Sequence, residues 1–411
     1  MFKYIKNKLY CENVSVEEIV KETLTPVYIY SKNQLIKNFK EFDNAFKNKK
    51  HLICYAVKAN TNREICKILF KLGAGADITS GGELYRVIKS GINPEKIVYA
   101  GTGKTKDEII YAVKNKILMF NVESVEELKL INKIGAEFNK KINIALRVNP
   151  NINPHTHKFI STGLNITKFG IPIKEIIDVY KYAKFNLKYL NIQGIHCHIG
   201  SQITQIKPFV IMTEKILDIV KKLQKINIDL NYINFGGGLG IKYNNEIPPT
   251  PKELSNNILK FLKNTHHILI FEPGRYIVGN TGILVTKILY KKQANKKNFL
   301  IVDAGMNDLI RPAFYSSFHK IITVNLKKTK KIKYDIVGPI CETSDFLGKD
   351  RYLPELNSGD LIAVSSTGAY GFSMSSQYNS RPRPPEIMVD NNNWYITRKR
   401  ENYIDLIKNE I

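Results

Sequence analysis

The sequence predicts a parallel (β/α)₈ barrel followed by a second, mainly antiparallel β domain. From about residue 31 to residue 280, short apolar runs alternate with amphipathic, helix-like segments, and there are eight such runs in about 250 residues. This number and spacing are those of a (β/α)₈ barrel. After about residue 280, apolar runs follow one another with only turn residues between them, which is typical of an antiparallel sheet. A doubly wound open sheet is the alternative for the first part, but it requires a topological switch point, of which the sequence shows no sign.

Each predicted barrel strand is a short apolar run without helical spacing. The eight runs are Leu52–Val57, Gly73–Ile78, Ile97–Ala100, Ile117–Val122, Ile142–Val148, Leu190–Cys197, Leu230–Phe235 and Ile268–Phe271. Predicted helices between them include Val125–Phe138, Ile173–Lys184, Phe209–Lys225 and Pro251–Asn264.

The predicted strands of the second domain are Ile283–Tyr290, Phe299–Val302, Tyr334–Val337, Leu361–Ser365 and Trp394–Thr397, with a short helix at the C-terminus. Two N-terminal strands, near Lys8–Glu12 and Val27–Tyr30, precede the βα rhythm, and we expect them to join this domain. The expected domains are therefore a barrel over 31–280 and a β domain over 281–411 that includes strands from 1–30.

Composition narrows the class of protein. The chain has 411 residues and a formal net charge of +25, but its lysines are scattered and its densest run, 327–333, has no interleaved aromatic residue. This pattern favours a solvated basic surface over a nucleic-acid site. The five cysteines form no CxxC pair, which predicts reduced thiols and a cytoplasmic protein. The N-terminus has no signal core, and no apolar run is long enough to span a membrane.

Polar residues follow the predicted strands at their C-terminal ends, where barrels of this kind carry their chemistry. These ends hold Lys58, Asp77–Glu83, Arg147–Pro150, His196–Ser201, Gly236–Gly238 and Glu272–Arg275. Since all parallel strands of a barrel end at one rim, these residues are expected to converge.

Lys58 is the first of these residues. An amine at a strand end is partly desolvated, which lowers its pKa and favours the free base that forms Schiff bases. Taken alone, the same pattern fits a lysine that extends into water. Gly236–Gly238 permits backbone N–H groups to approach a phosphate, although a plain tight turn has the same sequence. Gly274 and Arg275, at the next strand end, and the hydroxyl of Ser201 favour the phosphate site.

A lysine that forms Schiff bases and a phosphate site on one rim point to pyridoxal 5'-phosphate. Glu272 would then keep the pyridine nitrogen protonated, which makes the ring a strong electron sink. His198 is placed to lie against that ring. For each of these two residues, an ordinary buried polar side chain is the alternative interpretation.

Several longer motifs resemble those of the fold-type III pyridoxal-phosphate decarboxylases, in particular the diaminopimelate decarboxylase family. The resemblance extends over nearly the whole chain. Its motifs are Tyr55–Asn60, Phe159–Gly163, Lys168–Gly170, Gly194–Gln202, Gly236–Gly238, Glu272–Arg275, Arg311–Tyr315, Gly338–Glu342, Gly368–Tyr370 and Tyr378–Arg383.

The resemblance implies a role for each matching residue. Lys58 would be the Schiff-base lysine, Glu272 would face the pyridine nitrogen, and Cys341 would be the proton donor. The remaining cofactor contacts would come from His198, Ser201, Gly236, Gly237, Gly238, Gly274, Arg275 and Tyr370. The implied substrate-binding residues are Arg275, Arg311, Tyr315, Glu342 and Tyr370. The family also implies a homodimer in which the β domain of one subunit completes the barrel site of the other.

The far end of the substrate distinguishes the candidate reactions. Meso-2,6-diaminopimelate carries a second carboxylate and ammonium there; Arg275 and Arg311 suit the carboxylate, and Glu342 suits the ammonium. A decarboxylase of ornithine, arginine or a polyamine precursor needs acids at this end and no arginine. We therefore expect decarboxylation of meso-diaminopimelate to L-lysine and CO₂, the last step of lysine biosynthesis.

Three further alternatives remain open from the sequence. A racemase of the same fold would place a cation, not Glu272, near the pyridine nitrogen. A non-catalytic cofactor-binding barrel would not need Cys341 and Glu342. A metal-dependent hydrolase could use the pairs His155/His157 or His196/His198, but no carboxylate motif accompanies them, so no metal is expected. Asp77, Arg147, His155 and His157 are expected to support the site through contacts that the sequence does not define.

Overall fold

The computed structural model describes residues 2–153, 162–163, 167–263, 265–295 and 297–411. The chain divides into two compact units. The barrel unit comprises residues 39–241 and 247–276, and the β unit comprises residues 1–38, 242–246 and 277–411. The division passes through helix α2 (Lys32–Ala45), so the domain boundaries expected from the sequence stay a prediction.

Eight parallel strands form the closed barrel, as the sequence predicts. They are β5 (His51–Ala56), β6 (Gly75–Ile78), β7 (Ile97–Tyr99), β8 (Met119–Val122), β9 (Ile142–Asn149), β11 (Leu190–His196), β12 (Tyr232–Asn234) and β13 (Ile268–Phe271). Each strand pairs with the next, and β13 pairs with β5 to close the ring. A two-residue strand, β10 (Ile171–Pro172), pairs with β9 outside the ring.

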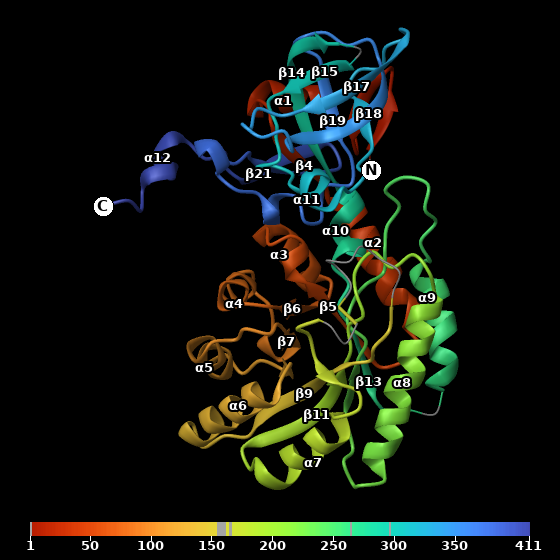
Figure 1. Ribbon diagram of the computed structural model, residues 1–411, viewed down its shortest axis with the longest axis vertical. Helices are drawn as coiled ribbons and strands as arrows, with labels where there is room; N and C mark the ends of the chain where they lie inside the picture. Colours follow the sequence, from red (N-terminus) through yellow and green to blue (C-terminus); the bar gives the residue numbers. More distant parts are fainter. Residues whose placement is uncertain (1, 154–161, 164–166, 264, 296) are drawn as a thin grey trace. The chain divides into compact units, whose positions relative to one another are not determined.

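Helices follow the barrel strands and cover the outside of the ring (Figure 1). They are α3 (Arg63–Lys71), α4 (Gly81–Ile88), α5 (Lys106–Lys114), α6 (Val125–Glu137), α7 (Ile176–Asn186), α8 (Lys207–Gln224) and α9 (Pro251–Ile258). Local sequence defines several of their starts. Thr105 and Thr250 each form a reciprocal capping box with the glutamate three residues later, which satisfies backbone N–H groups at the helix start.

The barrel interior changes from apolar to polar along the strands. Met119 and Ile270 belong to an apolar layer together with Cys54, Val98 and Ala145. Two residues further along β8 comes Asn121, and two residues beyond Ile270 comes Glu272, and both are buried. Because side chains two apart on a strand point to the same face, the polar layer lies on top of the apolar one, at the C-terminal rim.

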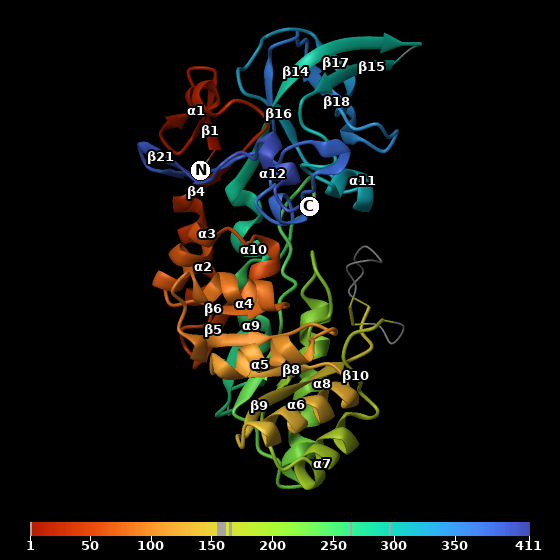
Figure 2. The same cartoon turned by 90° about the vertical axis from the view of Figure 1, so that its left-hand side faces the viewer.

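The β unit is built on the long strand β14 (Gly282–Ala294) (Figure 2). The main path of its sheet runs β18 (Phe346–Pro354), β17 (Lys331–Val337), β15 (Lys297–Val302), β14, β4 (Val27–Ser31), β20 (Glu386–Asp390) and β21 (Asn393–Arg398). Two further strands, β16 (Ile321–Thr323) and β19 (Leu361–Val364), pair with each other, and β19 also pairs with β14. The sheet is mainly antiparallel, and the pairs β15–β17 and β4–β20 are parallel.

The two predicted N-terminal strands occupy different sheets. β4 is hydrogen-bonded to β14 in the main sheet. β2 (Lys8–Cys11) instead forms a separate three-stranded sheet with β1 (Phe2–Ile5) and β3 (Val14–Ser15). Its residues Leu9 and Cys11 still pack into the core that β4 and β14 share, together with helix α1 (Val16–Thr23). Of the helices in the described part of the chain, none combines the length and hydropathy that a membrane span requires.

Candidate active site

Lys58 lies at the C-terminal rim of the barrel unit, in the short helix η1 (Val57–Ala59) that directly follows β5. Its Nζ atom donates a hydrogen bond to Oδ2 of Asp77, at a distance of 2.7 Å. The Lys58 side chain is 37% exposed, whereas Asp77 is fully buried on the neighbouring strand β6. The amine is therefore held at the rim by a buried carboxylate while it stays accessible.

Glu272 follows β13 and is held by hydrogen bonds from three other strands. Its Oε1 atom accepts from the side-chain amides of Asn121 (3.1 Å) and Asn234 (2.6 Å). Its Oε2 atom lies 3.1 Å from Nε2 of His196. Burial raises the pKa of this carboxyl, but His196, Lys58 and the hydrogen bond from Asn234 more than offset that and hold the pKa below its ordinary value. Glu272 is therefore a buried carboxylate that stays ionised.

His198 is half-buried just beyond the end of β11. Its Nδ1 atom accepts a hydrogen bond of 3.1 Å from the backbone N–H of Gly237. Because a backbone N–H can only donate, Nδ1 carries no proton, and the ring's proton is on Nε2. Burial lowers the pKa of His198 well below its ordinary value, and Arg147 and Lys58 lower it further. His198 is therefore a neutral imidazole in a fixed tautomer.

The loop Gly236–Gly238 requires residues without a side chain. A Cβ atom at Gly237 would lie 2.2 Å from the carbonyl oxygen of Glu272, and one at Gly236 would lie 2.7 Å from that of Cys197. Gly238 has a φ of +123°, a conformation that residues with a Cβ rarely adopt. The N–H groups of Gly236 and Gly237 donate to Asn234 and His198, so these two donors fix site side chains. Whether the loop also contacts an anion stays a prediction.

Ser201 and Arg275 form a second polar group at this rim. Arg275 begins helix α10 (Arg275–Val278), is buried, and donates to Oγ of Ser201 from Nη2 (3.0 Å) and Nε (3.3 Å). The Ser201 oxygen acts as an acceptor here, so its own hydrogen can be donated to an anion. A buried guanidinium beside a hydroxyl donor is suited to binding phosphate.

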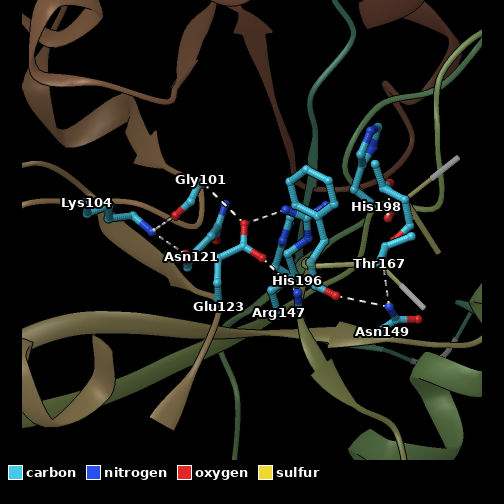
Figure 3. Close-up of polar contacts among 12 residues, drawn as sticks. Gly101, Lys104, Asn121, Glu123, Arg147, Asn149, Thr167, His196 and His198 are labelled. Carbon is cyan, nitrogen blue, oxygen red and sulfur yellow. Dashed lines mark hydrogen bonds and ion pairs between the residues drawn. The ribbon is translucent and has the colours of Figure 1, made fainter. Parts of the chain in front are cut away.

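Arg147, on β9, takes part in a buried charge cluster beside His196 and His198 (Figure 3). It pairs with Glu123, which follows β8. Glu123 also accepts hydrogen bonds from the backbone N–H groups of Gly101 (3.2 Å) and Gly170 (2.9 Å), which belong to two other rim loops. Arg147 therefore holds the rim together through Glu123. His155 and His157 lie outside the described residues.

Lys104 is a second buried cation, and it contacts strand β8. Its Nζ atom lies 2.6 Å from Oε1 of Glu127 and donates to the backbone oxygen of Asn121 at 2.9 Å. The Asn121 side chain in turn donates to Glu272. Lys104 did not emerge from the sequence as a site residue, although a lysine with a fully buried side chain needs such partners.

The β unit carries the other predicted substrate contacts. Arg311 is buried at the start of α11 (Arg311–Tyr315) and donates from Nε to Nε2 of His319 at 3.2 Å. Its guanidinium lies 5.8 Å from the centre of the Tyr315 ring. Cys341 and Glu342 are exposed in the loop between β17 and β18. Tyr370, half-buried after β19, has a φ of +56°.

Two residues at the polar end of the barrel did not emerge from the sequence as site residues: Asn121 and Asn234. Both are buried and donate to Glu272, as does His196, which the sequence indicated only as one residue of a strand end and of a possible metal pair. The available signal was strand alternation, because Asn121 and Asn234 each lie two residues beyond a position that faces the apolar layer, Met119 and Tyr232.

One described group, Asp229, His266 and His267, could present three ligand atoms to a metal, since these atoms lie within 4.8 Å of one another. The two imidazole rings are stacked, with centroids 4.2 Å apart and planes inclined by 24°. A metal lies near the plane of each ring that coordinates it, and two nearly parallel planes at this separation share no such point. This group lies in the loops that lead into β12 and β13, away from the C-terminal rim.

The rim of the barrel unit fits pyridoxal 5'-phosphate. The loop Gly236–Gly238 is closed to any Cβ, and Arg275 and Ser201 supply donors for a phosphate. Lys58 supplies an amine, and Glu272 supplies a carboxylate that stays ionised in a buried position. A buried carboxylate next to a ring nitrogen favours the protonated ring.

Comparisons with known proteins agree with this geometry. Residues 32–279 match the family model described as the pyridoxal-binding domain of the pyridoxal-dependent decarboxylases. Diaminopimelate decarboxylase of Aquifex aeolicus is 50% identical over 402 residues, which cover 98% of this chain and 95% of that protein. Diaminopimelate decarboxylase of Haemophilus influenzae is 46% identical, and the alignment covers 98% of each chain.

Solved structures give the same result. The crystal structure of Helicobacter pylori diaminopimelate decarboxylase complexed with L-lysine is 42% identical with a TM-score of 0.92, and it covers 95% of this chain and 98% of that one. The M. jannaschii diaminopimelate decarboxylase structure in complex with L-lysine is 39% identical with a TM-score of 0.95, and it covers 100% of this chain and 98% of that one. The chain therefore belongs to the pyridoxal-dependent decarboxylases and, among them, to the diaminopimelate decarboxylase family.

Proposed function

We propose that the protein uses pyridoxal 5'-phosphate to decarboxylate meso-2,6-diaminopimelate to L-lysine and CO₂, the last step of lysine biosynthesis. The observation that carries the proposal is that the accessible amine of Lys58 and the ionised carboxylate of Glu272 both lie at one barrel rim. A racemase needs a weaker electron sink, which such a carboxylate would not provide. Family membership points to the same reaction.

When bound, pyridoxal 5'-phosphate supplies an aldehyde that condenses with amines and a ring that takes up the electron pair left by CO₂. Lys58 would bind that aldehyde through its amine. Asp77 keeps the lysine side chain oriented, because its carboxylate accepts a hydrogen bond from Nζ. Glu272 would hold a proton at the pyridine nitrogen, and His198 would present its neutral ring to the cofactor.

The phosphate of the cofactor would be held by the residues that the resemblance selects. Ser201 and Arg275 supply a hydroxyl and a guanidinium, and Gly236–Gly238 and Gly274 permit close approach of the backbone. Tyr370 would contact the same region. At Gly274 an added Cβ would lie 3.0 Å from the Cβ atoms of Ala56 and Ala59, which explains the absence of a side chain there.

The far end of the substrate would be bound by residues of the β unit. Arg311 binds the second carboxylate, and its guanidinium is held in place by His319 and flanked by Tyr315. Glu342 binds the ammonium, and Arg275 and Tyr370 contribute from the cofactor side. Cys341 donates the proton that replaces the lost carboxylate on carbon, so one C–C bond breaks and one C–H bond forms. Its thiol is exposed, which suits this role.

We infer that two chains assemble into a homodimer with shared active sites, in which the β unit of one subunit serves the barrel of the other. Exposed Cys341 and Glu342 are available to such a partner. A cytoplasmic location is part of the proposal. Five free cysteines, four of them buried, suit a reducing compartment.

A direct assay separates the candidate reactions. Purified protein with added cofactor is incubated with meso-diaminopimelate, L-ornithine or L-arginine, and CO₂ and the product amine are measured. We expect equimolar CO₂ and L-lysine from meso-diaminopimelate only. Release of CO₂ from ornithine or arginine at a comparable rate would favour the alternative decarboxylases. Bound cofactor without any turnover would favour the non-catalytic barrel.

A further inference from the structure

His196 makes a buried contact with Glu272 that the known chemistry of the site does not require. The His196 ring is 1% exposed, and its Nε2 atom lies 3.1 Å from Oε2 of the carboxylate. We propose that His196 is a positioning residue that holds Glu272 in its negatively charged form and thereby sets the protonation of the cofactor's pyridine nitrogen. This inference rests on the proposed function and extends it to a residue outside the implied cofactor and substrate contacts.

The two oxygens of the Glu272 carboxylate accept hydrogen bonds from different side chains. Oε1 accepts from two neutral amides, those of Asn121 on β8 and Asn234 on β12. Oε2 receives its hydrogen bond within the described part of the chain from His196, on β11. Loss of His196 therefore leaves one buried carboxylate oxygen without this donor, whereas the other oxygen keeps two.

The tautomer of His196 follows from its surroundings. An ionised carboxylate only accepts, so Nε2 of His196 carries the proton between them. Its Nδ1 atom is buried and has no hydrogen-bond partner among the described residues. His196 therefore donates to Glu272 from Nε2 in a fixed direction.

Other ionisable groups face this pair from every side of the barrel end. Burial raises the pKa of Glu272, and the neighbours that lower it are headed by His196, with Lys58 next. Glu123 acts on His196 from the end of β8, and Arg147 on β9 pairs with that carboxylate. The groups that face Glu272 and His196 are Cys54 on β5, Lys58 after β5, Asp77 on β6, Glu123 after β8 and His198 after β11.

These surroundings predict the effect of losing the donor. The charges of Asp77 and Glu272 repel each other. A Glu272 carboxylate that has lost the hydrogen bond from His196 should therefore gain a proton more readily. The His196→Leu variant removes the N–H while it keeps a side chain that fills much of the space. The His196→Gln variant restores an N–H donor at nearly the position of Nε2. His266→Leu, at an exposed histidine near the other end of the barrel, is the matched control.

The first measurement uses the cofactor-free protein. Infrared difference spectra against Glu272→Gln, with carbon-13 glutamate, report whether Glu272 is ionised. We expect Glu272 to stay ionised from about pH 8 to about pH 5 in the wild type. The titration is then followed below about pH 5 to the acid limit of the folded protein, where the protonated form of Glu272 should appear in His196→Leu at a pH higher by about one unit or more than in the wild type, and His196→Gln should reverse most of that shift. An unchanged titration in His196→Leu would overturn the inference.

The second measurement uses the cofactor-loaded enzyme. His196→Leu should lower kcat by roughly tenfold to a hundredfold, with little change in KM, since the coupling within one hydrogen-bonded cluster is of this size. In a Glu272→Gln background the same substitution should have little further effect, because the amide has no charge to be held. A full additional loss in that background would assign His196 a structural role and overturn the inference.

The two proposals fail separately. If the wild type does not decarboxylate meso-diaminopimelate, the proposed function is wrong, and the infrared titration of the cofactor-free protein still decides whether His196 governs Glu272. If the wild type is active while His196→Leu retains normal kcat and a normal Glu272 titration, the inference alone is wrong. Circular dichroism of each variant verifies folding, and His196→Gln provides the test if His196→Leu does not fold.

Discussion

Lys58 and Asp77 form an ion pair across adjacent barrel strands, with 2.7 Å between Nζ and Oδ2. Burial, followed by the charge of Glu272, raises the pKa of Asp77, and Lys58 opposes this rise. The Oδ1 atom of Asp77 has no hydrogen-bond partner among the described residues. The Lys58 amine therefore stabilises the charged form of Asp77, which burial and the nearby Glu272 disfavour. The same ion pair holds the Lys58 side chain at the rim.

The first prediction concerns Lys58 itself. Lys58→Ala should lose turnover by at least about a thousandfold, because the variant lacks the amine that holds the aldehyde. After borohydride treatment, the mass of the wild-type protein should increase by one reduced cofactor, and the mass of Lys58→Ala should not. Lys71→Ala, at the end of the neighbouring helix α3, is the control and should behave as wild type. Turnover by Lys58→Ala without added amine would contradict the assignment.

The second prediction concerns the glycine loop. A Cβ at Gly237 would lie 2.2 Å from the carbonyl oxygen of Glu272, so Gly237→Ala must displace backbone. We expect the free energy of unfolding to fall by about 1 to 3 kcal/mol and cofactor affinity to fall with it. Gly103→Ala is the matched control, since an added Cβ there meets nothing within 4 Å. Chemical denaturation and cofactor titration measure both quantities, and equal behaviour of the two variants would show that the loop is not tightly packed.

The third prediction concerns pH and Glu401 in the β unit. Its Oε1 accepts from Nε of Arg383 at 2.7 Å, and its Oε2 accepts from Gln377 at 2.9 Å. Burial raises the pKa of Glu401, but these hydrogen bonds, with Arg383 first, lower it from 4.5 to about 2. The folded state thus favours the ionised form, so the stabilisation is present above pH 4.5 and is lost as the pH falls towards 2.

Glu401→Gln should therefore destabilise the protein at pH 7 by about 1 to 2 kcal/mol, after allowance for solvent screening of a partly exposed pair. The difference from wild type should shrink steadily below pH 4.5. Glu410→Gln, at an exposed glutamate of the same C-terminal segment, should have no comparable effect. Denaturant unfolding at several pH values measures the difference, and a difference that is independent of pH would show that the lost charge is not the cause.

The fourth prediction tests whether active sites are shared between subunits. Lys58→Ala and Cys341→Ala chains are each expected to be nearly inactive. If Cys341 serves the partner's barrel, a mixed dimer contains one site with both defects and one intact site. With random assortment about half the dimers are mixed, so activity should recover to about a quarter of wild type. Verified subunit exchange without recovered activity would place both residues in the same subunit's site.

Much of the fold could be predicted from local patterns. All eight barrel strands lie where apolar runs predict them, because a buried parallel strand must be apolar whatever its neighbours are. Strands β16, β18 and β20 of the β unit were not predicted, and β2 entered a separate sheet. Pairing partners in an antiparallel domain depend on contacts between distant segments, which periodicity does not encode.

The sequence by itself determined the barrel, the order of its strands and the identity of the residues that follow each strand, since these depend on local polarity and motifs. Only the tertiary structure decided which side chains form hydrogen bonds at the buried end of the barrel. Asn121 and Glu272 are 151 residues apart and His196 and Glu272 are 76 apart, yet all three meet in one hydrogen-bonded cluster. The register of parallel strands around the closed ring places these side chains at one depth, and a single strand contains no information about that register.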